Sequence, residues 1–149
     1  MIAPADPAKV VALARGWLGT PYHHGASNRG AGTDCLGLVR GVWRELNGID
    51  AEMPPAYSPA WRDCGDGEPL LEAAARHLIP AGVGPDAGDV VLFRLRRDAR
   101  VKHAAILVSP TRMIHAQEGV PVSEVGLGPW WQRRIAGVFR FPLLVSSTR

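Results

Sequence analysis

The order of helical and strand patterns predicts an α+β fold in which N-terminal helices pack on a small antiparallel β-sheet. Helical patterns fill the first half of the chain, and short strand patterns follow from residue 89 onward. A chain with helices first and strands after them forms an antiparallel sheet. One strand pattern, Ala104–Val108, is apolar at every position, which is typical of a central strand covered on both faces. The length of 149 residues fits a single domain spanning 1–149.

Three helices are expected before the sheet. The first has Asp6 as its N-cap and Pro7 at its first position, and its apolar face ends at the glycines of 16–19. The second runs from about Asp34 to Leu46, where Asn47-Gly48 provides a C-terminal stop. The third is short and covers residues 70–78.

Five short strands are expected in the second half, at 89–93, 101–109, 112–116, 120–125 and 135–141. Two other segments have no periodic pattern. Residues 19–32 are rich in glycine and predict a loop, and Met53–Gly67, with three prolines, predicts an irregular excursion.

The composition excludes several classes of protein. Hydrophobic residues make up 46% of the chain and charged residues 21%, which excludes a disordered tail, a collagen-like fibre and a coiled coil. No apolar run approaches the roughly 18 residues of a membrane span. Residues 1–10 lack a basic stretch followed by an apolar core, so no signal peptide is expected. Two cysteines are too few for a disulfide scaffold.

Cys35 is the stronger nucleophile candidate of the two cysteines. It lies where the glycine-rich loop meets the second helix, and the positive end of a helix dipole favours a thiolate. Backbone N–H groups there also suit an oxyanion. The alternative is a buried cysteine acting as a small hydrophobe. Cys64 has no histidine close in sequence and is interpreted as an incidental thiol. A disulfide between the two is not expected, because it would consume the nucleophile.

Two histidines are candidates for the general base and its partner. His103 opens the central strand and His115 closes the next one, so both are also compatible with structural roles. His103 has the right chemistry to accept a proton from Cys35. In a hairpin, an odd-length loop centred on Ser109 places the two histidines opposite each other, and an even-length loop places them on opposite faces. Cys–His–His is the catalytic constellation that the first arrangement predicts.

These residues carry a family resemblance. The chain resembles the NlpC-type papain-like cysteine peptidases that cut bacterial cell-wall peptides. The matching pieces, in the family's order, are Leu18–Tyr22, Gly25, Thr33–Leu38, Gly88–Phe93, His103–Val108 and Met113–Ala116.

The resemblance implies a papain-like fold with a set of site residues. Cys35 would be the nucleophile, His103 the base and His115 the orienting residue. Tyr22 would help shape the oxyanion site, or pack on the core as an ordinary loop aromatic, and His24 would line the cleft beside it. The implied scissile bond is a γ-D-glutamyl–diamino acid amide in peptidoglycan, and no cofactor is needed.

Within the family, the chain looks most similar to peptidases encoded with the tail genes of phages and gene transfer agents. The resemblance lies in Pro21–His24, Asp34–Val39 and Gly128–Pro142. It implies tail or baseplate proteins as partners and local wall digestion during DNA delivery. The protein would then be made in the cytoplasm, carried in a particle tail, and act in the recipient's periplasm.

Two departures from the family pattern leave substrate preference open. Many relatives carry serine after the nucleophile, where this chain has Leu36, and the usual glycine pair after the tyrosine is Gly25-Ala26. Two other functions also stay open. One is an amidase, thioesterase or acyltransferase on the same scaffold, and the other is a tail structural subunit with vestigial catalytic residues.

Three further features of the sequence give weaker indications of function. His23 and His24, with Cys35 and the other two histidines, lack the spacing of a zinc site, so no metal is expected. The basic segment Arg94–Lys102 has two interpretations: a surface patch that binds an anionic cell wall or nucleic acid, or a solvated loop. Because the chain has no aromatic residues interleaved with these cations and no nucleic-acid-binding motif, nucleic-acid binding is not predicted. Trp130-Trp131 is expected to pack on the sheet, with docking to a tail protein as the alternative.

Overall fold

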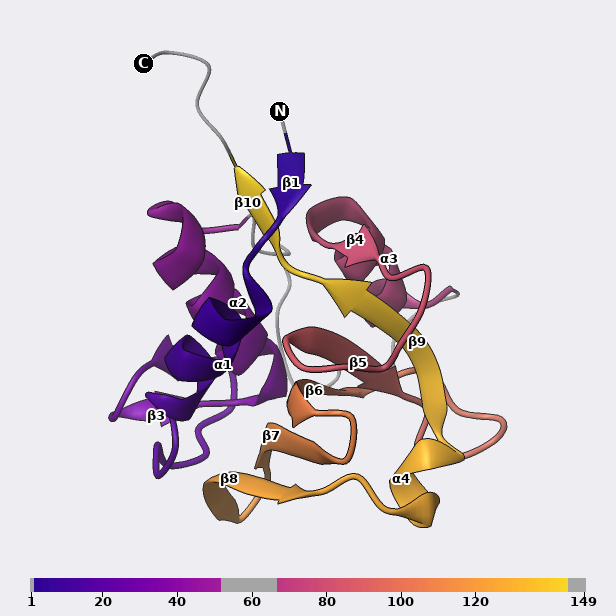
Figure 1. Ribbon diagram of the computed structural model, residues 1–149. Helices are drawn as coiled ribbons and strands as arrows, with labels where there is room; N and C mark the ends of the chain where they lie inside the picture. Colours follow the sequence, from indigo (N-terminus) through magenta and orange to yellow (C-terminus); the bar gives the residue numbers. More distant parts are fainter. Residues whose placement is uncertain (1, 52–66, 145–149) are drawn as a thin grey trace.

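The computed structural model describes residues 2–51 and 67–144. All of the predicted excursion except Gly67 lies outside these residues, as does Cys64. Within the described part, the expected α+β architecture is present, with helices and an antiparallel sheet (Figure 1). None of the helices described is long and apolar enough to cross a membrane.

A six-stranded antiparallel sheet has the strand order β4-β9-β5-β6-β7-β8. All five expected strands are in it, within two residues of their predicted ends. The strands are β4 (Ile79–Pro80), β5 (Asp89–Phe93), β6 (His103–Ser109), β7 (Arg112–Gln117), β8 (Val120–Gly126) and β9 (Ile135–Arg140). β6 lies between β5 and β7, which confirms the central strand predicted from its uniformly apolar run.

In the described part of the chain, three helices precede the six-stranded sheet, and a fourth lies between β8 and β9. They are α1 (Pro7–Arg15), α2 (Cys35–Asn47), α3 (Pro69–His77) and α4 (Pro129–Gln132). The predicted caps are confirmed: the Asp6 carboxylate accepts from the Ala8 N–H at 3.1 Å, and Gly48 ends α2 with a left-handed φ of 76°.

The smallest strands of the fold have no counterpart among the elements predicted from the sequence. β1 (Ile2–Pro4) pairs with β10 (Pro142–Leu144), and β2 (Ser27–Asn28) pairs with β3 (Gly32–Thr33). Strands of two or three residues are too short to show a period, so pairing with a partner strand decides their conformation.

The two faces of the sheet have separate apolar clusters. Val90, Leu92, Ala104 and Ile106 join the larger core that also contains the buried residues of α1 and α2. The alternate residues of the same strands, Val91 and Ala105 among them, join a smaller cluster with Leu127 and the partly buried Trp131. Strand alternation thus gives the sheet a helix-covered face and a second face.

Candidate active site

Cys35 is the first residue of α2 and is 4% exposed. The preceding residue, Asp34, has an extended backbone, with φ −108° and ψ −172°, and caps the helix. Its Oδ1 accepts from the Gly37 N–H at 2.7 Å. This cap confirms the predicted start of the helix at the thiol. It also occupies one of the N–H groups that a helix otherwise leaves unbonded at its N-terminus.

The buried Asp34 carboxylate also holds the glycine-rich loop against the helix. Its Oδ2 accepts from the Gly25 N–H at 2.8 Å. The loop comes so close that a Cβ on Gly37 would collide with the carbonyl oxygen of Ala26. One side chain therefore fixes both the first turn of α2 and the loop packed on it.

His103 and His115 form a buried pair. The Nε2 of His103 and the Nδ1 of His115 are 2.8 Å apart, and the residues are 8% and 4% exposed. The interplanar angle of 79° places the rings edge to face. The predicted association of these two histidines is therefore present in the structure.

A β-bulge brings the two histidines to one face of the sheet. Ser109 pairs with Arg112 across a two-residue turn, and an uninterrupted ladder from that even-length loop would put the histidines on opposite faces. The register shifts between Leu107 and Ser109, so that Leu107 pairs with Met113. The extra residue is Val108, and it restores the parity that an odd-length loop would give. His103 and His115 are then diagonal neighbours.

The thiol lies against the chain just before β6 begins. The Sγ of Cys35 lies 3.8 Å from the carbonyl oxygen of Lys102, the residue directly before His103. Cys35 comes from the helix-covered side of the sheet, whereas the histidines belong to the second face. Because Nε2 of His103 contacts His115, Nδ1 is the other ring nitrogen of His103 that can exchange a proton.

Trp131 packs on the histidine pair. Its ring stacks on His103 with centroids 5.5 Å apart, and it meets His115 edge-on at 5.4 Å. The neighbouring Trp130 is 47% exposed. Packing on the sheet was the prediction for both tryptophans, and it holds for Trp131. Its place on the catalytic histidine candidate was not predicted, because adjacent tryptophans give no sign of which one points inward.

Burial lowers the pKa of His115 below its ordinary value of 6.5. The cause is desolvation, which penalises the charged imidazolium. His115 is therefore neutral at neutral pH, and its Nδ1 can accept a hydrogen bond from a protonated His103.

The two remaining predicted site residues lie near the start of α2. The backbone of Tyr22 bridges to Thr33, two residues before Cys35, and its side chain packs partly on the larger core. The Nδ1 of His24 lies 3.7 Å from the Oδ2 of Asp34. Among the described residues, no group of three or more His, Cys, Asp or Glu side chains could hold a metal ion.

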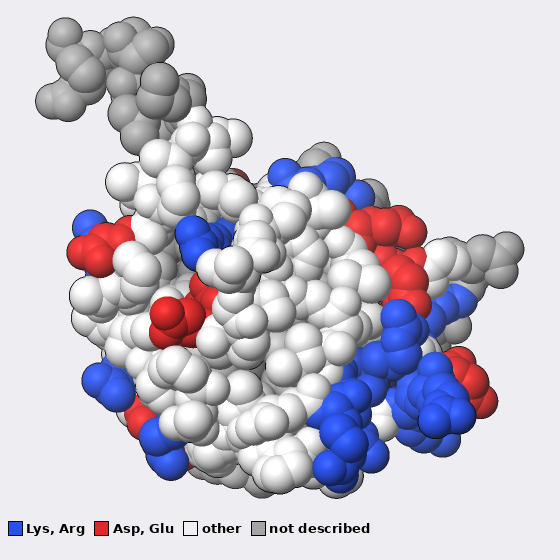
Figure 2. All heavy atoms as spheres, turned by 45° about the vertical axis from the view of Figure 1, so that its right-hand side comes forward, with Lys and Arg blue, Asp and Glu red and all other residues white. Residues whose placement is uncertain are grey.

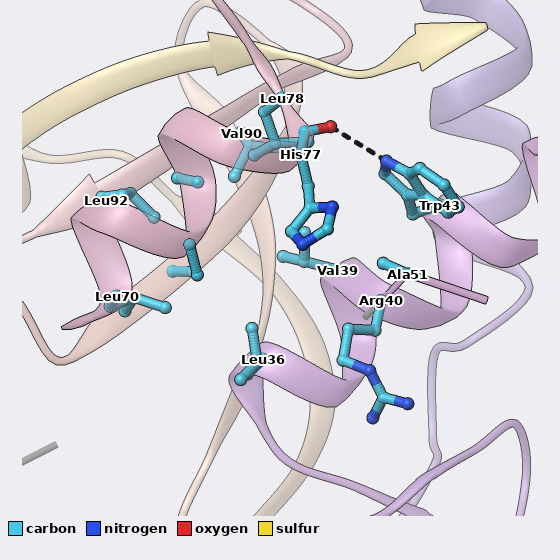
Figure 3. A pocket seen from close by; sticks show the side chains of 13 residues that line it. Leu36, Val39, Arg40, Trp43, Ala51, Leu70, His77, Leu78, Val90 and Leu92 are labelled. Atoms are coloured by element: carbon cyan, nitrogen blue, oxygen red, sulfur yellow. Dashed lines mark hydrogen bonds between the residues drawn. The ribbon is translucent and has the colours of Figure 1, made fainter. Parts of the chain in front are cut away.

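An apolar hollow lies between α2 and α3 (Figure 3). Leu36, the residue after Cys35, lines it, and so do Trp43 and His77, whose carbonyl oxygen accepts from the Trp43 indole N–H at 3.0 Å. Cys35 and the two histidines are not part of its lining. The side chain that departs from the family pattern thus turns toward aliphatic surroundings.

The fold places this chain in the class of papain-like α+β domains. Cys35 begins a helix, and its sulfur lies next to the carbonyl oxygen of the residue that precedes the strand-borne His103. The NlpC/P60 family model matches residues 19–140, and the chain belongs to the NlpC/P60 family, whose members include cysteine peptidases and peptidoglycan hydrolases.

Two curated relatives match over most of this chain. The γ-DL-glutamyl hydrolase of Bacillus subtilis (strain 168) is 30% identical over 142 residues, covering 92% of this chain and 31% of the relative. Tail tip assembly protein K of Escherichia phage N15 is 26% identical over 117 residues, covering 72% and 44%. The chain thus spans less than half the length of either relative.

Solved structures agree on the fold. An NlpC/P60 family protein from Bacillus cereus superposes with a TM-score of 0.67 at 20% identity, covering 95% of this chain and 42% of that one. The NlpC/p60 domain of the peptidoglycan hydrolase SagA gives a TM-score of 0.58 at 24% identity, covering 95% of this chain and 100% of that domain.

Proposed function

We propose that this chain is a cysteine peptidase that hydrolyses amide bonds in peptidoglycan stem peptides, acting as a single catalytic domain. The observation that carries the proposal is the capped helix start at Cys35 beside the hydrogen-bonded pair of His103 and His115. Membership of the NlpC/P60 family supports the substrate class.

The proposed reaction begins with attack of the Cys35 thiolate on a peptide carbonyl. Backbone N–H groups in the first turn of α2, with Tyr22, hold the oxyanion, whereas the Gly37 N–H is taken by Asp34. His103 takes the thiol proton through Nδ1, passes it to the leaving amine, and then activates water to hydrolyse the thioester. The neutral His115 accepts the Nε2–H of the His103 imidazolium and stabilises it. No step requires a cofactor.

The proposed scissile bond is the γ-D-glutamyl–diamino acid amide. Its support is the similarity to a protein named γ-DL-glutamyl hydrolase. Cleavage elsewhere in the stem peptide, or acyl transfer to an acceptor other than water, would use the same three residues.

We place the protein in the tail of a phage or gene transfer agent, where it would open the wall for DNA delivery. The similarity to the tail tip protein of phage N15 supports this role. On this proposal the protein is synthesised in the cytoplasm, assembles with tail or baseplate proteins, and acts in the recipient's periplasm.

Replacing the nucleophile tests the chemistry. Cys35→Ala should abolish release of new termini from purified stem peptides, measured by mass spectrometry, while the melting temperature stays close to that of the parent. A Cys64→Ser variant is the matched thiol control and should retain activity. Hydrolysis that survives Cys35→Ala would remove Cys35 as the nucleophile.

The same variant distinguishes an enzymatic role from that of a structural tail subunit. Particles carrying Cys35→Ala should assemble normally and fail to digest the wall. Failure to assemble would favour a structural role. Conversion of stem peptides to products other than a free acid and amine would favour an acyltransferase.

A further inference from the structure

Arginine side chains line a depression between the residues that follow β5 and those at the start of β9. The segment 94–102 contains five basic residues and a single acid, Asp98, and two more arginines follow α4. Figure 2 shows these cationic side chains gathered at the lower right of the surface. Five arginines line the depression together with aliphatic side chains such as Leu95 and Ile135: Arg94, Arg96, Arg97, Arg133 and Arg134.

Hydrogen bonds hold the two arginine-bearing segments together. The Arg94 N–H donates to the Arg134 carbonyl oxygen at 2.8 Å, and the Arg134 Nε donates to the Leu95 carbonyl oxygen at 3.3 Å. The Arg134 guanidinium also donates to the Trp130 carbonyl oxygen at 2.7 Å and lies 3.7 Å from the centroid of its ring. The depression is therefore fixed by the backbones of both segments.

Most of the arginines that line the depression make no ion pair with a described residue. Arg94 pairs with Glu68 at 2.7 Å. Arg96, Arg97 and Arg133 are exposed and make no ion pair with any described residue, and the hydrogen bonds of Arg134 go to carbonyl oxygens. Such a concentration of charge attracts anions from solution.

Both segments lead directly into the candidate active site. Arg94 follows Phe93, which pairs with His103 across the sheet. The other segment begins just after Trp131, which stacks on His103. A peptide held at the thiol therefore has the arginine-lined depression as a neighbouring surface.

We infer that this depression binds carboxylates of the peptide substrate, so that the enzyme prefers stem peptides with free carboxyl groups over amidated ones. The inference rests on the proposed function and specifies the substrate class. Guanidinium groups pair with carboxylates in a planar, bidentate manner. No aromatic side chain lines the depression, and the nearby exposed ring of Trp130 already stacks on the Arg134 guanidinium, which favours a carboxylate peptide over stacked nucleic-acid bases.

The kinetic test compares one stem peptide with the same peptide whose carboxyl groups are amidated. The parent should have a lower KM for the free acid. In the variant Arg96→Gln/Arg97→Gln/Arg133→Gln, KM for the free acid should rise about tenfold with little change in kcat, because each exposed ion pair contributes a factor of about two to five. The ratio of kcat/KM for acid over amide should fall toward one.

A matched control variant distinguishes ion pairing inside the depression from the effect of the protein's net charge. Lys9→Gln/Arg76→Gln removes exposed cations from α1 and α3, outside the depression. Its acid-to-amide ratio should equal that of the parent, and Arg96→Gln/Arg97→Gln, which removes the same number of charges, should lower the ratio. Equal effects of these two variants, or no preference of the parent for the acid, would overturn the inference.

A binding measurement with an inactive variant tests the carboxylate site separately from catalysis. Cys35→Ala protein should bind a fluorescent free-acid stem peptide more tightly than its amidated form, and the triple arginine change should remove the difference. If this holds while the parent cleaves nothing, the proposed function fails and the carboxylate site stands. Tighter binding of a DNA oligonucleotide of equal charge, at the same ionic strength, would overturn the carboxylate assignment.

Discussion

The protonation state of His115 links the stability of this protein to its catalytic chemistry. In the unfolded chain, His115 takes up a proton near pH 6.5, whereas in the fold burial lowers its pKa. Between the folded and unfolded pKa values, the unfolded state binds more protons. The free energy of unfolding therefore decreases as the pH falls from about 6.5 through the lower folded pKa. Protonation also removes the acceptor that His103 needs.

We expect activity and stability to weaken together on the acid side. The kcat should fall as His115 becomes protonated, and urea unfolding at pH 7.5 and at lower pH should show the loss of stability. His115→Asn retains a hydrogen-bond acceptor without a titrating ring. It should reduce the pH dependence of the unfolding free energy while lowering kcat. An unchanged pH dependence in that variant would remove His115 as its source.

We expect Trp131 to act as a positioning residue for the imidazole of His103. Its ring stacks on His103 and touches His115, so its removal admits water beside the pair and frees the imidazole to rotate. Trp131→Ala should lower kcat by about tenfold or more, in the range of supporting residues, and shift the acid limb of the pH–rate profile. Trp131→Phe keeps an aromatic face and should restore part of both. If thermal unfolding moves but neither kinetic quantity does, Trp131 is only structural.

Among the secondary-structure elements, the close contact between α1 and α2 depends on a glycine in α2, which has no side chain. Trp17, just after α1, is fully buried, and its indole N–H donates to Glu45 at 3.2 Å. A Cβ on Gly41 would collide with the Trp17 ring. The close approach of the two helices therefore needs glycine at this position.

Gly41→Ala should destabilise the fold even though alanine is the better helix former. The propensity gain is about 1 kcal/mol, and overpacking of a fully buried ring costs about 1–3 kcal/mol. Because Trp17 is fully buried and bonded to Glu45, its ring cannot move aside cheaply, and we expect a net loss in the free energy of unfolding, measured in urea. Adding Trp17→Phe removes part of the clash, so the double variant should lose less than the sum of the single changes. Strict additivity would exclude the contact as the cause.

The β6–β7 hairpin sets one property of the site that local sequence signals do not encode. Apolar runs and helix caps predicted the long elements and the start of α2 at Cys35, because these signals are local. Whether His103 and His115 share a face depended on the parity of the ladder, which one extra residue at Val108 decides. Val108 has no feature in the sequence that marks it as a bulge. The stacking of Trp131 on His103 is equally non-local.

At the scale of the whole molecule, the candidate site requires the correct docking of two layers. The thiol belongs to the helical layer, and the two histidines belong to the sheet face that carries the smaller cluster with Trp131. The order of helices and strands predicted both layers. It did not predict that the site lies at the beginning of β6, because the distance between layers is set by tertiary packing.

Because β1 pairs with β10, the same fold should form when its elements follow one another along the chain in a circularly permuted order. Ile2 pairs with Leu144, so the ends of the described chain lie side by side (Figure 1). A short glycine-serine linker could join them, and new ends could open at the exposed turn formed by Glu118 and Gly119. This circular permutant should fold and keep its kcat. By the same geometry, the domain can be inserted as a module into a surface loop of a larger host protein without being pulled apart.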